Sequence, residues 1–317
     1  MDEAIMVQGL SKRFGAVTAL KAVDFRVPTG TVFGLLGPNG AGKSTAIRIL
    51  TTIARPTAGQ ARVLGYDVVR DAAVVRTLIG LAGQYAAIDS NLTGRENLRL
   101  IGRLTHIRRS RIRSRAAELL ERFDLTEAGD RPARTYSGGM RRRLDVAAAL
   151  VPEPPVLFLD EPTTGLDPQS RNGLWETVRQ LVADGTTVLL TTQYLEEADR
   201  LAERVVVIDH GRIIADDTPS ALKTRMGDTV IELDMGTDGR ARQAAELLRG
   251  RLSVPADVED GRLRLTSREG SRPLLGILRL LDTHGLVPDA VAVREPSLDD
   301  VFLELTGRRA GTTASVP

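Results

Sequence analysis

The alternation of apolar and polar residues along the chain predicts buried strands separated by helices. Two runs are apolar almost throughout and a third has an apolar centre between threonines, which is typical of strands that a parallel sheet buries on both faces. Two shorter runs near the N-terminus, at 4–10 and 22–27, predict strands separated by a turn. The apolar runs are 31–37 (TVFGLLG), 156–159 (VLFL) and 186–192 (TTVLLTT), and residues 76–82 are apolar as well.

Between these runs, apolar residues recur at helical spacing. Residues 204–217 instead predict two short strands with Gly211 in the turn between them. Strands that alternate with helices in this way indicate an α/β fold with a parallel sheet. Helices are predicted after the loop at 37–45 to about 54, in parts of 85–150, at 168–183, in 194–203 and at about 218–225.

The C-terminal part of the sequence follows a different order. Its pattern predicts β-α-β-β-α-β, which is the order of a ferredoxin-like domain. No catalytic constellation occurs there, so we expect a small α+β domain at 228–309 after a first domain at 1–227, and a flexible polar tail at 310–317. The predicted elements are strand 229–235, helix 240–249, strands near 251–258 and 262–267, helix 272–283 and strand 286–294, followed by a last helix in SLDDVFLELTG.

Composition excludes several kinds of chemistry. The 317 residues contain no cysteine, which rules out disulfides, thiol catalysis and cysteine-ligated zinc. The 43 basic and 41 acidic residues nearly cancel, so net charge gives no support for a nucleic-acid partner. The three histidines lack metal-ligand spacing. The sequence shows neither a signal-peptide pattern at its start nor an apolar run near the roughly 18 residues of a membrane helix.

The strongest chemical signal is the nine-residue stretch GPNGAGKST, which fits the phosphate-loop pattern G-x-x-x-x-G-K-[ST]. Glycines let backbone N–H groups wrap a phosphate, and the positive end of the following helix points at it. The lysine reaches the β and γ phosphates, and the serine hydroxyl binds Mg²⁺. The predicted nucleotide-binding residues of this stretch are Gly37, Pro38, Asn39, Gly40, Ala41, Gly42, Lys43, Ser44 and Thr45.

Two carboxylates follow a predicted buried strand directly. Asp160 and Glu161 come at its carboxyl end, which is where ligands bind in open α/β sheets. Burying paired acids is costly unless they serve a purpose. We therefore predict that Asp160 coordinates Mg²⁺, through water, and that Glu161 accepts a proton from an attacking water molecule.

Three further features have two interpretations each. Ser137, Gly138 and Gly139 form either an ordinary helix cap or a second anion cradle at a helix N-terminus. Phe14 is either a core residue or a functional aromatic. A basic run is either a solvated helix face or a surface for an acidic partner or lipid headgroups. This run consists of Arg103, Arg108, Arg109, Arg111, Arg113 and Arg115.

The ordered set GPNGAGKST, Gln84, YSGGM, VLFLDEP and GLDP resembles the ATP-binding cassette family over about residues 4–225. The resemblance implies a P-loop NTPase with a RecA-like parallel sheet core, an antiparallel β subdomain and a helical subdomain at about 85–150. It also implies that Phe14 stacks on adenine. Gln84 would contact Mg²⁺ and the nucleophilic water, and would begin the helical subdomain that docks on a membrane partner.

The same resemblance implies an assembly. YSGGM matches the family signature, so Ser137, Gly138 and Gly139 would bind the γ-phosphate of ATP held by an opposing subunit. Asp167 matches a loop that crosses the dimer interface. One chain supplies one phosphate loop and one signature, so two copies are expected to dimerise head-to-tail around ATP and Mg²⁺.

Two positions depart from the family pattern. The signature ends in Met140 rather than glutamine, and Gln193 stands where the family has its switch histidine. Glutamine can hydrogen-bond a γ-phosphate, but it cannot carry a proton. Slow ATP hydrolysis is therefore an open alternative. The resemblance nevertheless implies catalysis, because the base Glu161 is retained, and it gives Gln193 the catalytic role of the switch histidine.

The departures resemble one branch, the daunorubicin-resistance type of ATP-binding subunit, and REPSLDDVFLELTG extends the likeness to the C-terminal domain. This implies an ATPase at the cytoplasmic face of the membrane that powers export of a hydrophobic drug, antibiotic or lipid through a separate permease. One alternative is a soluble cassette ATPase acting on nucleic acid or ribosomes. It lacks support, because the chain has no long coiled coil, zinc cysteines or second cassette. Another alternative is a regulatory ATP-binding module of low turnover. No nucleic-acid partner is expected, and the sequence does not identify the exported compound.

Overall fold

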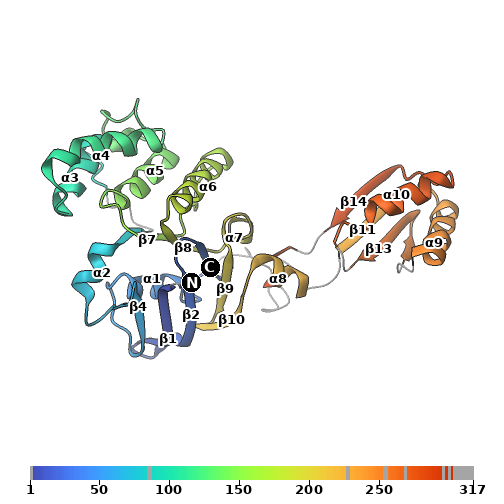
Figure 1. The fold of residues 1–317 in the computed structure, drawn as a ribbon, viewed down its shortest axis with the longest axis horizontal. Coiled ribbons are helices and arrows are strands. Elements are labelled where there is room, and N and C mark those ends of the chain that lie inside the picture. The colour runs from blue at the N-terminus through green and yellow to red at the C-terminus, as the bar shows by residue number, and fades with distance from the viewer. Residues whose placement is uncertain are drawn as a thin grey trace, which may run out of the picture. The chain divides into compact units, whose positions relative to one another are not determined.

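The computed structural model describes residues 3–83, 88–225, 229–252, 256–267, 270–294, 297–298 and 301–302. These residues form two compact units, one that ends at Pro219 and one that begins at Ser220 (Figure 1). The predicted domain boundary at 227/228 falls in a stretch outside the described residues. So do the predicted tail at 310–317 and most of the last predicted helix. The boundary and the tail therefore stay predictions.

The first unit is built on a six-stranded sheet in the order β10-β9-β3-β8-β7-β6. All of its pairs are parallel except the one between β9 and the edge strand β10. Every residue of β3, β7 and β8 is buried, as their apolar runs predict. The strands are β3 (Val32–Leu36), β6 (Ile79–Ala82), β7 (Val156–Asp160), β8 (Thr187–Thr192), β9 (Arg204–Asp209) and β10 (Arg212–Asp217).

A second sheet, in the order β2-β1-β4-β5, is antiparallel. The two predicted strands and the turn between them are present, but the predicted bounds 4–10 and 22–27 were too short, because the ladder continues to the pair Phe14–Val17. Ladder hydrogen bonds hold the outer residues in place although many are exposed, so the apolar pattern does not mark the strand ends. The strands are β1 (Glu3–Phe14), β2 (Val17–Pro28), β4 (Ala58–Val63) and β5 (Tyr66–Asp67).

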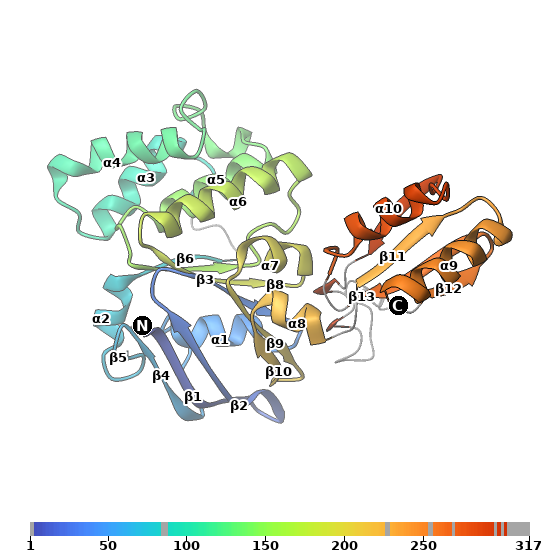
Figure 2. The same ribbon diagram turned by 45° about the vertical axis from the view of Figure 1, so that its right-hand side comes forward.

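Helices cover both faces of the parallel sheet (Figures 1 and 2). Helix α1 (Lys43–Leu50) shares one apolar core with both sheets, in which Phe33, Ile47 and Phe158 are fully buried. Helices α6 (Pro168–Ala183) and α7 (Leu195–Leu201) pack on the other face. The short helix α2 (Ala72–Leu78) leads directly into β6.

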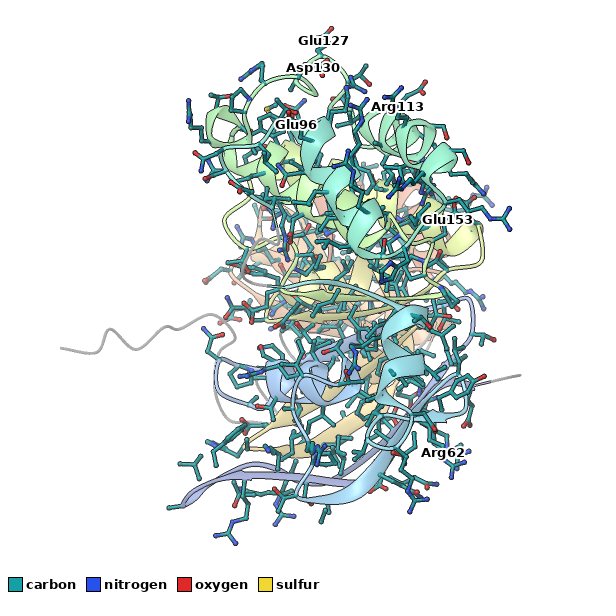
Figure 3. The ribbon with its side chains drawn as sticks, turned by 90° about the vertical axis from the view of Figure 1, so that its left-hand side faces the viewer. Arg62, Glu96, Arg113, Glu127, Asp130 and Glu153 are labelled. Atoms are coloured by element: carbon teal, nitrogen blue, oxygen red, sulfur yellow. The ribbon has the colours of Figure 1, made fainter. Side chains whose placement is uncertain are left out.

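Three packed helices form a separate layer above the sheet: α3 (Gly94–Leu104), α4 (Arg109–Arg122) and α5 (Gly138–Ala149). A short 3-10 turn, η1 (Ala133–Thr135), precedes α5. The start of α3 is fixed by a capping box between Thr93 and Glu96. In the basic run on α4, Arg111 lies 3.2 Å from Glu153, whereas Arg113 is exposed on the outer side (Figure 3).

The second unit begins within α8 (Pro219–Arg225) and contains a four-stranded antiparallel sheet in the order β12-β13-β11-β14. Helices α9 (Asp238–Leu252) and α10 (Leu274–Thr283) pack on one face of this sheet (Figure 2). The element order β-α-β-β-α-β is the predicted one. The strands are β11 (Thr229–Asp234), β12 (Ala256–Glu259), β13 (Arg262–Ser267) and β14 (Ala290–Arg294).

Candidate active site

The glycine-rich loop connects the end of β3 to the start of α1, as its sequence predicts. Two of its glycines are sterically required. Gly37 has φ 157°, and a Cβ there would lie 2.1 Å from the carbonyl oxygen of Ile208. Gly42 has φ 116°, and a Cβ there would lie 2.6 Å from the carbonyl oxygen of Ala19. Any larger residue at either position would push the loop away from the neighbouring backbone.

The N-terminus of α1 is open. Its N-cap is Gly42, which gives no side-chain cap, and the first N–H groups of a helix have no intrahelical acceptor. These groups and the positive helix end favour an anion in front of them. A pocket of about 200 Å³ lies at this place, lined by Ala19, Pro38, Asn39, Gly40, Gly42, Lys43, Ser44, Thr45 and Glu161.

Lys43 is almost fully buried, with 3% of its side chain exposed. Its ammonium donates hydrogen bonds to the carbonyl oxygens of Gly37 at 2.7 Å and Pro38 at 3.2 Å. It also lies 3.3 Å from Oε1 of Glu161. Burial lowers the pKa of Lys43, and the neighbouring carboxylates of Glu161 and Asp160 oppose that shift. The lysine of the loop and the predicted base therefore meet in one pocket.

Asp160 is the last residue of β7, and its carboxylate joins three segments. Oδ1 accepts a hydrogen bond from Oγ1 of Thr191 on β8 at 2.6 Å and from Oγ of Ser44 on α1 at 3.2 Å. Sequence reasoning missed Thr191, although the two threonines that end this buried strand were a possible signal. The Ser44 hydroxyl and the Asp160 carboxylate place two hard oxygen ligands side by side at the pocket.

This pair of oxygens fits Mg²⁺, which is usually bound by one or two carboxylates together with phosphate oxygens and water. In the part of the chain that the structure describes, no group of three or more His, Cys, Asp or Glu residues is arranged to hold a metal ion. An ion held jointly with a bound phosphate matches its donors.

Glu161 has an unusual backbone for a residue other than glycine. Its φ is +49°, in the left-handed region, and its N–H donates to both the carbonyl oxygen and Oγ1 of Thr191 at 3.1 and 3.0 Å. Surrounding structure has to hold such a conformation in place. The result is a nearly buried carboxylate turned toward Lys43.

The predicted signature and dimer-loop residues lie together, apart from the pocket lining. Ser137 caps α5 by accepting a hydrogen bond from the N–H of Met140 at 3.2 Å. Asp167 caps α6, and its two carboxylate oxygens accept bonds from the N–H and the hydroxyl of Ser170 at 2.9 and 2.7 Å. The hydrogen bond from the N–H of Ser170 has the largest effect in lowering the pKa of Asp167, and the bond from the Ser170 hydroxyl lowers it further. A Cβ on Gly139 would meet Oγ of Ser170 at 2.5 Å, so the two helix starts are in contact.

The remaining predicted residues differ in how the structure places them. Phe14 is 48% exposed, with Nζ of Lys12 4.8 Å from its ring centre, so the interpretation of Phe14 as a core residue is wrong. Gln193 directly follows β8 and is partly exposed. Gln84 lies outside the described residues, just after Gly83.

Comparison with known proteins identifies relatives along nearly the whole chain. A model of the ABC transporter family matches residues 20–164. The chain is 53% identical to the daunorubicin resistance ATP-binding protein DrrA3 of Streptomyces coeruleorubidus, over 96% of each chain. It is 49% identical to the daunorubicin/doxorubicin resistance ATP-binding protein DrrA of Streptomyces peucetius, over 97% of this chain and 93% of the relative.

A solved structure shares the fold of the first unit. This is the dimeric post-hydrolysis state of an ATP-binding cassette bound to ADP and Pi. It matches with a TM-score of 0.62 and 25% identity, over 68% of this chain and 98% of that chain. No helix in the described ranges of the present chain is both long and apolar enough to cross a bilayer. From its site geometry and these relatives, the chain belongs to the ABC transporter family, as a nucleotide-binding ATPase subunit of the daunorubicin-resistance type.

Proposed function

We propose that this chain powers the export of a hydrophobic drug, antibiotic or lipid through a separate integral membrane permease. The observation that carries the proposal is 53% identity, over 96% of both chains, to a daunorubicin resistance ATP-binding protein. The chain would work as a peripheral subunit at the cytoplasmic face of the membrane. The near balance of 43 basic and 41 acidic residues gives no reason to expect a nucleic-acid partner.

In this proposal, ATP binds in the pocket at the start of α1. Backbone N–H groups from Gly40 to Thr45 and the Lys43 ammonium hold the β and γ phosphates, and exposed Phe14 stacks on adenine. The Ser44 hydroxyl and the Asp160 carboxylate, together with Gln84, would hold Mg²⁺, which neutralises phosphate charge when bound. The distance of 3.2 Å between Oγ of Ser44 and Oδ1 of Asp160 supports the proposal that these two residues hold one ion.

Glu161 is proposed to orient the attacking water and to accept its proton. Its carboxylate lines the same pocket as Lys43, so water placed beside it would also lie near a bound γ-phosphate. Gln193 would donate one hydrogen bond to a γ-phosphate oxygen from the end of β8. The rate gain would then come from positioning and charge stabilisation, as in other phosphoryl-transfer enzymes.

A head-to-tail dimer would complete each site. Gly139 lies against Ser170, whose hydroxyl donates a hydrogen bond to Asp167, and none of Ser137, Gly138 and Gly139 lines the pocket. They would bind the γ-phosphate held by a second copy, with Asp167 at the interface. ATP binding would close the dimer, hydrolysis would reopen it, and the permease would change its access to the two sides of the membrane.

Export itself is tested in cells. Deleting the gene for this chain from its host should raise the accumulation of daunorubicin or of another hydrophobic compound, measured by fluorescence. Wild-type protein should restore efflux, and the Glu161→Gln variant should not. Unchanged accumulation for a panel of hydrophobic drugs would exclude drug efflux. Co-purification of the tagged chain with ribosomes or nucleic acid, rather than with a permease, would favour the soluble alternative.

Gln193→Ala tests the departure from the family's switch histidine. A hydrogen bond from the neutral amide to a charged phosphate is worth about 1.5–3 kcal/mol. At about 1.4 kcal/mol per factor of ten, its loss should slow turnover roughly 10- to 100-fold. Steady-state phosphate release at saturating ATP measures this, and Gln193→His should keep or raise the rate. An alanine variant as fast as wild type would show that Gln193 does not touch the phosphate.

We further propose that the domain from about residue 228 onward serves assembly or regulation. Its sheet has a core of its own, formed by residues such as Ile231, Leu248 and Leu265, so its removal should leave the cassette core intact. A chain truncated before residue 228 should bind ATP with wild-type affinity, measured by fluorescent-nucleotide titration. The assembly of this truncated subunit, or the regulation of its activity, should be impaired. Loss of nucleotide binding in a folded truncation would place the boundary elsewhere.

A further inference from the structure

Arg142, in the second turn of α5, makes an unusual set of contacts. Its Nε donates a hydrogen bond to the carbonyl oxygen of Pro162 at 2.8 Å, and Nη2 donates to that of Asp160 at 3.0 Å. Nη1 donates to the carbonyl oxygen of Gly83. One guanidinium therefore joins α5 to the end of β7 and to the segment that follows β6.

Two of these contacts lie on either side of Glu161. The carbonyl groups of Asp160 and Pro162 belong to the residues immediately before and after it, and Glu161 itself has φ +49°. Residues other than glycine rarely adopt this conformation, and they keep it only where their surroundings fix it. Thr191 holds the N–H of Glu161, and Arg142 holds the flanking carbonyl groups. Together these bonds fix the peptide unit that precedes Glu161 and the one that follows Pro162.

The charge of Arg142 is compensated inside the protein. The side chain is 13% exposed, and Nη1 lies 3.2 Å from Oδ2 of Asp145, one turn along α5, whose side chain is 2% exposed. Burial lowers the pKa of Arg142, and the carboxylates of Asp145, Asp160, Glu197 and Glu161 act against this shift. The rigid, planar fork of a guanidinium suits several carbonyl oxygens at once, whereas a lysine ammonium is a single point donor.

We propose that Arg142 is a positioning residue for the hydrolytic reaction, holding the backbone around Glu161 so that its carboxylate stays at the phosphate pocket. This inference rests on the proposed role of Glu161 as the base. Because the same guanidinium also holds Gly83, a shift of α5 relative to β7 would strain all three carbonyl contacts. Helix α5, which Ser137 caps, is thereby connected to the proposed base by hydrogen bonds.

The test uses the full chain and two variants that avoid an unpaired buried charge. The double variant Arg142→Gln/Asp145→Asn removes both charges of the pair. Arg142→Lys keeps the charge but loses the fork. Misplacing a reacting group by about 1 Å can cost about 100-fold in rate, so both variants should show a kcat roughly 10- to 100-fold below wild type. The Kd for ATP, measured by fluorescent-nucleotide titration, should stay within about threefold of wild type, because neither residue lines the pocket.

Arg143→Gln is the matched control. Arg143 is the next residue of α5, and its Nη1 also donates to a backbone carbonyl, that of Phe123 at 2.9 Å, and contacts Asp124 at 3.2 Å. These partners lie in the helical layer rather than beside the base. With rates normalised to folded protein by thermal melting, Arg143→Gln should keep the wild-type kcat.

A double-mutant cycle with Glu161→Gln separates the possible outcomes. If Arg142 acts through Glu161, Arg142→Lys should cause little further loss in the Glu161→Gln background. Additive losses, or a wild-type kcat for both Arg142 variants, would overturn the inference and leave the role of Glu161 intact. If Glu161→Gln alone keeps wild-type turnover, the proposed role of Glu161 fails, whatever the Arg142 variants do.

Discussion

Glu161→Gln should lower steady-state ATP hydrolysis by about 10²- to 10⁴-fold, which is the usual contribution of a general base. The amide has nearly the same shape as the carboxylate, but it cannot accept a proton from water. Nucleotide binding should survive, because the phosphate loop and Lys43 are unchanged. Phosphate release at saturating ATP measures the loss of turnover, and titration with a fluorescent nucleotide measures the remaining affinity.

The same variant should accumulate an ATP-bound dimer, because hydrolysis is the step that reopens it in the proposed cycle. Size-exclusion chromatography with and without ATP would detect that dimer. Glu153→Gln is a suitable control, since Glu153 pairs with Arg111 on the surface and is no part of the pocket. Wild-type turnover by Glu161→Gln would remove this residue from the mechanism.

Lys43→Ala should abolish measurable turnover and weaken ATP binding. Removing one preorganised donor to a developing anion typically costs about 10²- to 10³-fold in kcat. The loss of a charge-assisted hydrogen bond of about 1.5–3 kcal/mol weakens binding by roughly 10- to 100-fold. Lys43 lies at the start of α1 with its ammonium on the loop carbonyls of Gly37 and Pro38, so the effect should fall on this pocket. Calorimetric titration with ATP and a phosphate-release assay together measure it.

The Lys43 variant needs a check on folding, because its ammonium lies 3.3 Å from the buried carboxylate of Glu161. Circular dichroism and thermal melting should show a folded protein, since the core beneath the loop is apolar and does not depend on this ion pair. Lys21→Ala serves as the control, because Lys21 does not line the pocket. A folded Lys43→Ala variant that still releases phosphate at the wild-type rate would refute the assignment.

The sequence by itself determined the features that depend on neighbouring residues. The phosphate loop was predictable because a contiguous motif contains its steric and electrostatic requirements, such as glycine at positions 37 and 42 beside the backbone of β9 and β2. The buried strands β3, β7 and β8 were predictable because a parallel sheet buries both of their faces, which favours runs of apolar residues over polar–apolar alternation. The helix cap at Ser137 was predictable because an N-cap bond joins a residue to a backbone N–H only three positions further along the chain.

Tertiary structure alone decided which distant residues meet. The order β3-β8-β7 places Thr191 beside Asp160 and Glu161, and no local pattern states that order. The contacts of Arg142 depend on how α5 packs against the ends of β6 and β7. The sequence around Arg142 therefore does not distinguish it from its neighbours Arg141 and Arg143. The ends of β1 and β2 depend on ladder hydrogen bonds between exposed residues, which leave no apolar trace in the sequence. Local patterns encode burial and backbone geometry, whereas long-range pairing is set only when the whole sheet assembles.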